Sequence, residues 1–113
     1  MSARAETLLW LAQRVTGALL SVLVAVHLAT MIYAVQNGLT AAEILGRTRG
    51  SPGWATFYGL FVVAVAVHAP IGLRNVIAEW TAWRGPSLGW AMLALAVLLA
   101  LLGFRAVWAV AVG

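Results

Sequence analysis

The chain of 113 residues has no cysteine and few charged side chains. Without a thiol it can form no disulfide, thiolate-held iron–sulfur cluster, thiolate zinc site or covalent c-type heme, and it has no cysteine nucleophile. Any metal that it binds must therefore use histidine or carboxylate ligands. Charged residues make up 9% of the chain and hydrophobic residues 64%, whereas about a quarter of the residues of a soluble domain are charged. This composition predicts an integral membrane protein.

Lysine is absent as well, so all seven basic residues are arginines, and they outnumber the three glutamates to give a net charge of +4. The arginines are scattered singly rather than clustered in a stripe, which does not favour a nucleic-acid partner. Charge at the ends of membrane helices is the better interpretation. Arg4, Arg14, Arg74 and Arg84 then lie toward one side of the membrane and Arg47, Arg49 and Arg105 toward the other. This bias predicts a cytoplasmic amino terminus.

Three long apolar runs follow one another along the chain. A helix that crosses the hydrocarbon core needs about 20 apolar residues, so we expect transmembrane helices at about residues 8–35, 54–79 and 88–112. The first run is too long for a signal peptide and lacks a cleavage site. Residues 36–53 have the composition of a loop, with one short helical turn around residues 41–45. We predict one all-α membrane domain over residues 1–113, inside a larger transmembrane bundle.

Histidines are the notable polar residues inside these spans, because polar groups persist in a membrane chiefly where they face protein, cofactor or water. His27 lies in the first run and His68 in the second. An imidazole can ligate iron, relay a proton or bond a neighbouring helix. A b-type heme needs only axial histidines between helices. Arg74, six residues after His68 but about 120° around the helix, would bend toward a heme propionate, and Gly72 would leave flat space for the ring.

Arg14 begins a second polar cluster, near the amino-terminal end of the first run. A quinone site needs a donor to a carbonyl oxygen at the membrane interface, beside an apolar slot. The Arg14 guanidinium supplies that donor and stabilises charge that develops on the oxygen. Gly17 and Ser21 share its helix face, and Trp10, one turn earlier, would form a wall. An arginine that only reaches lipid phosphate is the alternative.

Two motifs in these regions resemble the cytochrome b membrane-anchor subunit of succinate dehydrogenase, also called complex II or succinate:quinone oxidoreductase. That family has a histidine followed by glycine four, arginine six and an acidic residue eleven positions later, which His68, Gly72, Arg74 and Glu79 match. Its first-helix motif is His-Arg-x-Ser/Thr-Gly. Residues 13–17 read QRVTG and match that motif except at the first position.

The resemblance implies a bacterial inner-membrane subunit of a succinate dehydrogenase or fumarate reductase. A flavoprotein with FAD and an iron–sulfur protein would oxidise succinate, and electrons would pass to quinone in the membrane. His68 would be an axial ligand of heme b, with the second ligand from a partner anchor subunit. Arg74 would lie near a propionate, and Arg14, with Trp10 and Gly17, in the quinone pocket.

Several alternatives stay open from the sequence. His27 is either a ligand of a second heme, a partner of His68 or a polar contact to another subunit. The whole chain is alternatively a structural anchor or assembly protein without a cofactor. A small transporter or proton channel ranks last, because it requires paired ionisable groups along one path and the chain has only scattered ones.

Overall fold

A computed structural model describes residues 2–113 of the chain. Four helices follow in order: α1 Ala3–Gln36, α2 Ala41–Thr48, α3 Pro52–Trp80 and α4 Pro86–Ala111. No strand occurs among the described residues. Three of the helices, α1, α3 and α4, are long and apolar enough to cross a membrane. The all-α class and the three membrane-spanning helices are thus confirmed, and the chain is an integral membrane protein.

Two helix boundaries differ from the sequence prediction because polar caps extend the helices. α1 begins at Ala3 rather than near residue 8, since the Ser2 hydroxyl accepts a hydrogen bond from the Ala5 backbone N–H at 3.1 Å. The expected loop contains the complete eight-residue helix α2 rather than a single turn. Thr40 and Glu43 form a capping box at its start, which satisfies free backbone N–H groups.

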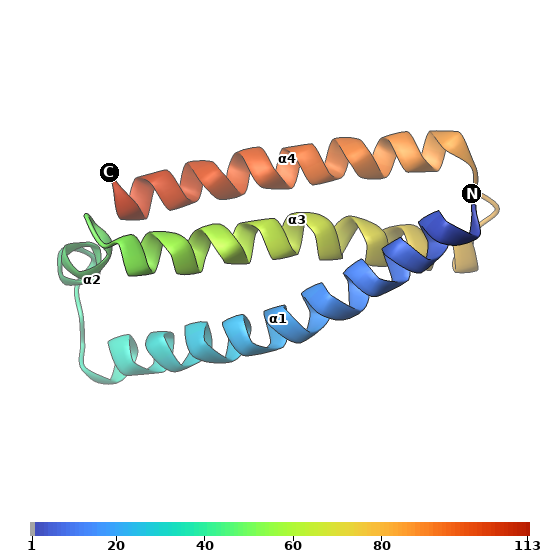
Figure 1. The fold of residues 1–113 in the computed structure, drawn as a ribbon. Coiled ribbons are helices and arrows are strands. Elements are labelled where there is room, and N and C mark those ends of the chain that lie inside the picture. The colour runs from blue at the N-terminus through green and yellow to red at the C-terminus, as the bar shows by residue number, and fades with distance from the viewer. Residues whose placement is uncertain (1) are drawn as a thin grey trace.

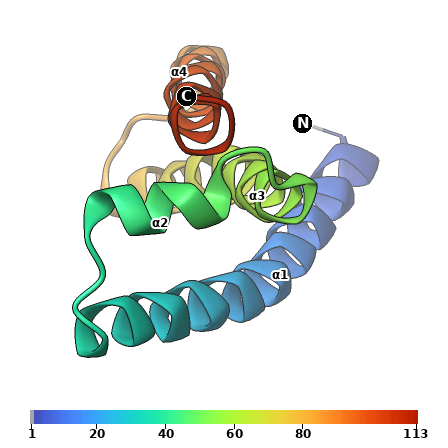
Figure 2. The ribbon, with the colours of Figure 1, turned by 90° about the vertical axis from the view of Figure 1, so that its left-hand side faces the viewer.

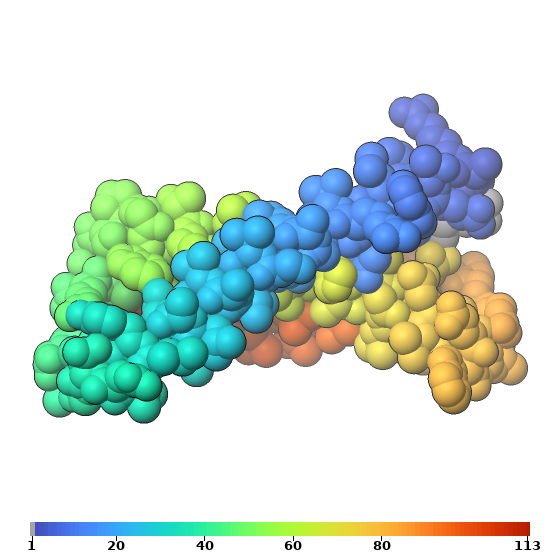
Figure 3. Space-filling view, turned by 90° about the horizontal axis from the view of Figure 1, so that it is seen from below, coloured from blue at the N-terminus to red at the C-terminus, as the bar shows by residue number. Residues whose placement is uncertain are grey.

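The three long helices are arranged around α3 as the central element. α4 runs beside α3, and α1 lies on its other side (Figure 1). α1 crosses α3 diagonally (Figure 3). Toward the carboxyl end of α1 the two helices diverge, and α2 lies across the space between them (Figure 2). The molecule measures 49 × 24 × 23 Å, so its long axis exceeds the hydrocarbon core of about 30 Å. Both ends of the bundle therefore reach the headgroup regions.

Few side chains of this chain are enclosed by its own helices. Among the described residues, the buried hydrophobic ones are Leu23, Ala64, Leu88 and Ala111. Most of the leucine, valine and tryptophan side chains on the three spans point outward and are exposed. Such apolar outer faces suit lipid or further transmembrane helices.

The closest packing lies between α3 and α4. A Cβ atom added to Gly103 would approach Val62 Cγ1 to 2.6 Å, so only glycine fits at this helix contact. At the same end of the bundle, the buried Thr48 hydroxyl donates a hydrogen bond to the Val110 carbonyl at 2.6 Å. This bond joins α2 to α4 and satisfies a polar group that would otherwise be unpaired in an apolar setting.

Gly103→Ala is expected to destabilise the bundle, because the new methyl group must push Val62 and α4 apart. Overpacking of this kind costs about 1–3 kcal/mol, and it would lower the thermal midpoint of unfolding in detergent. Gly89→Ala is the matched control, since nothing lies within 4 Å of a Cβ at that position of α4. Equal thermal midpoints for the two variants would contradict the close packing.

Candidate functional site

His68 lies near the middle of α3, on the side of this helix that contacts α1. Its Nδ1 atom is 3.1 Å from the Thr16 hydroxyl oxygen on α1. The Thr16 hydroxyl also donates to the Ala12 carbonyl, at 2.7 Å. A Cβ on Gly17 would lie 3.4 Å from His68 Cε1, so the imidazole edge packs against the α1 backbone. Both contacts come from α1, so this helix holds the Nδ1–Cε1 edge of the ring.

The other ring nitrogen of His68, Nε2, is open. No hydrogen bond to it occurs among residues 2–113, and it is not among the enclosed polar atoms that lack a partner. No cluster of three or more His, Cys, Asp or Glu side chains occurs in this part of the chain either. A metal bound by side chains alone would need such a cluster, whereas a porphyrin supplies four nitrogen ligands and needs only axial ones. One open imidazole in an apolar setting therefore fits half of a b-type heme site.

Gly72 lies one turn after His68 on α3, and its surroundings differ from the prediction. The sequence predicts that Gly72 leaves flat space beside His68 for a porphyrin. Instead, the Gln13 side chain fills that space, since a Cβ on Gly72 would lie 3.0 Å from Gln13 Nε2. Gln13 Oε1 is enclosed and has no hydrogen-bond partner among the described residues. Gly72 thus permits the close approach of α1 and α3.

His27 lies in a separate aromatic environment. Its ring contacts Tyr58 and Phe61 edge to face, with both centroid distances 5.9 Å. It lines two cavities, of about 460 Å³ and 350 Å³. His27 follows Thr16, the partner of His68, by eleven positions on α1, or about 16 Å along the axis. The pairing of His27 with His68 considered from the sequence is therefore wrong for this chain by itself.

Arg14 and Trp10 are brought together on the outer face of α1. The Arg14 guanidinium carbon lies over the Trp10 ring at 5.3 Å from its centroid, a cation–π arrangement. Both side chains are exposed, and Trp10 is 59% accessible. Gly17 instead faces His68. An exposed guanidinium beside an indole face is available to a planar ligand that lies against α1.

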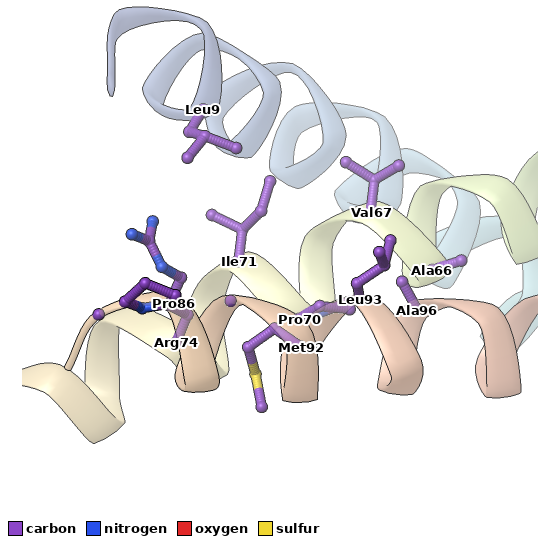
Figure 4. A pocket seen from close by; sticks show the side chains of 12 residues that line it. Leu9, Ala66, Val67, Pro70, Ile71, Arg74, Pro86, Met92, Leu93 and Ala96 are labelled. Atoms are coloured by element: carbon purple, nitrogen blue, oxygen red, sulfur yellow. The ribbon is translucent and has the colours of Figure 1, made fainter. Parts of the chain in front are cut away.

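Arg74 lines an apolar groove of about 560 Å³ between α3, α4 and the start of α1 (Figure 4). It is the only charged residue among the groove's lining residues, and His68 is not part of that lining. The two side chains thus open on different sides of α3, as their spacing of six residues predicts. The proximity of Arg74 to a heme propionate stays a prediction.

The contacts of Thr16 and Gln13 with α3 were not predicted from the sequence. The contacting pairs are Gln13 with Gly72 and Gly17 with His68, and each pair of residue numbers adds to the same sum. Residue pairs in contact between antiparallel helices have such a constant sum. Placing the two motifs side by side on antiparallel helices could therefore have predicted these contacts. The spacing of the motifs within each helix does not reveal it.

Known proteins that are similar to this chain are membrane subunits. Residues 1–108 match the family described as succinate dehydrogenase/fumarate reductase transmembrane subunit. The chain is 34% identical over 77 residues to a succinate dehydrogenase hydrophobic membrane anchor subunit of Archaeoglobus fulgidus. That alignment covers 68% of this chain and 65% of the relative. No solved structure matches the chain. The chain belongs to the succinate dehydrogenase/fumarate reductase transmembrane subunit family.

Proposed function

We propose that this chain is the cytochrome b membrane anchor of a succinate dehydrogenase, and that it binds heme b and helps to form the quinone site. The observation that carries the proposal is the open Nε2 of His68 at the crossing of α1 and α3. Heme b at this position would accept one electron and pass it on. His68 would hold the iron, and Thr16 and Gly17 would hold the imidazole.

A second anchor subunit would supply the other axial ligand. The remaining histidine of this chain, His27, contacts Tyr58 and Phe61 at another level of α1. The exposed apolar faces of α1 and α4 would cover the porphyrin together with helices of that subunit. Arg74 would meet a propionate if its flexible side chain turns out of the groove.

Quinone would bind near the amino-terminal half of α1. The Arg14 guanidinium would donate to a quinone carbonyl oxygen, and the Trp10 ring beside it would line the slot. Arginine stays protonated, so Arg14 stabilises charge on that oxygen and does not deliver the proton. Gly17 lies about one turn after Arg14 on α1 and packs against His68. The proposed quinone site would therefore lie close to the proposed heme ligand.

Partner subunits would carry out the succinate chemistry. This chain has no cysteine for an iron–sulfur cluster, so FAD and the clusters would lie in a flavoprotein and an iron–sulfur subunit. The amino terminus of α1 and the turn between α3 and α4 lie at one end of the bundle (Figure 1). We place that end in the cytoplasm, where its arginines would orient the iron–sulfur subunit, in a bacterial inner membrane.

The complex that copurifies with this chain in mild detergent tests the proposal. The expected complex contains a flavoprotein, an iron–sulfur protein and a second anchor, and it shows a b-type band in the reduced-minus-oxidised spectrum. A chain that copurifies with the soluble subunits but lacks heme would instead be a cofactor-free anchor. A preparation without the soluble subunits would contradict the proposed function.

A further inference from the structure

The hydroxyl group of Thr16 has three neighbours but only one hydrogen. Its oxygen lies 2.7 Å from the Ala12 carbonyl, 3.3 Å from the Gln13 carbonyl and 3.1 Å from His68 Nδ1. Carbonyl oxygens only accept hydrogen bonds. An oxygen–oxygen separation of 2.7 Å is typical of an O–H···O bond, and without a hydrogen between them the two atoms would repel. The hydrogen therefore points to Ala12.

This assignment fixes the proton on the His68 ring. With its hydrogen directed at Ala12, the Thr16 oxygen can only accept from His68, so Nδ1 of His68 carries the N–H. A neutral imidazole has one N–H, and Nε2 is then left with a free lone pair. Nε2 is also the ring nitrogen without a hydrogen bond in the described residues, since the bond to Thr16 is made at Nδ1. The lone pair is thus on the nitrogen that is open.

Metal-bound histidines generally have this arrangement, since their second nitrogen donates to an oxygen that fixes the tautomer and the ring orientation. We propose that Thr16 is a positioning residue that holds His68 in the Nδ1-protonated tautomer and directs Nε2 at the heme iron. The inference rests on the proposed function, because it assumes that His68 is a ligand. Thr16 itself touches neither iron nor quinone.

The two residues beside Thr16 support the same role. Gly17 brings the α1 backbone against the imidazole, and a side chain there would contact His68 Cε1. Gln13 packs on Gly72 one turn away, which keeps α1 at the distance that the Thr16 bond requires. The hydrogen bond and the packing both hold the Nδ1–Cε1 edge of the ring.

Thr16→Val tests the inference in the assembled complex, because valine has the shape of threonine but no acceptor. Loss of such an outer partner lowers metal affinity by about 10- to 100-fold, which heme transfer to an apoprotein acceptor would measure. The heme midpoint potential is expected to become more positive, since an imidazole without an acceptor on its N–H donates less charge to iron. Thr16→Ser, which restores the hydroxyl, is expected to return both values to those of the wild type.

Thr30→Val is the matched control, since among residues 2–113 the Thr30 hydroxyl on the same helix bonds only the His27 carbonyl, at 2.7 Å. It is expected to change neither heme transfer nor potential. Unchanged values in Thr16→Val would overturn the inference, and so would equal heme loss in Thr16→Val and Thr16→Ser, which would indicate a packing role. A heme signal that persists in His68→Ala would instead overturn the proposed function.

Discussion

His68→Ala is expected to remove the b-type band from the reduced-minus-oxidised spectrum of the complex. The alanine variant has no imidazole at this position of α3, where Nε2 of His68 is open. Axial ligands are the only coordinate bonds between the iron of a b-type heme and its protein. The bound heme is therefore expected to fall to background, as measured by the pyridine hemochrome assay.

His27→Ala is the control for this substitution. It removes an imidazole from the same bundle, but from the aromatic cluster with Tyr58 and Phe61. Full heme content in this variant is expected for a complex with one heme, and half the content would assign His27 to a second heme. An unchanged spectrum in His68→Ala, with the complex intact by size-exclusion chromatography, would contradict the ligand assignment.

Arg14→Leu is expected to abolish most quinone reduction while the heme stays bound. The substitution removes the donor to the quinone oxygen but leaves the apolar surface of the pocket. Removal of one preorganised donor lowers turnover by about 100-fold or more. Succinate oxidation with a soluble artificial acceptor is expected to continue, because that reaction does not use the membrane site.

Arg105→Leu provides a matched loss of charge near the other end of the bundle, where Arg105 is exposed on α4. It is expected to leave quinone reduction at the wild-type rate. Arg14→Lys keeps the charge but not the planar donor pair, and we expect an intermediate rate. Full quinone turnover in Arg14→Leu would exclude Arg14 from the pocket.

The all-α fold with three spans could be predicted from composition because the bilayer restricts which structures can cross it. Apolar runs of sufficient length must become helices in lipid, where each backbone polar group needs a partner within its own segment. Pro52 and Pro86 then begin α3 and α4, since proline suits the first turn of a helix. The caps at Ser2 and Thr40 extended the helical structure beyond the apolar runs, which hydropathy alone does not detect.

The details of the site depend on how α1 and α3 pack, and hydropathy does not specify that. The spacing of residues on one helix gave the relation of Arg74 to His68, because helix geometry fixes it. It did not give the contact of Thr16 with His68 or the filling of the space beside Gly72 by Gln13. Those contacts depend on the register between two helices.

A cryo-electron microscopy map of the complete complex tests the central claim most directly. The expected map shows a porphyrin whose iron is bonded to Nε2 of His68 and to a histidine of a second anchor polypeptide. A map in which the His68 imidazole faces lipid or another side chain, with no macrocycle beside it, would contradict that claim.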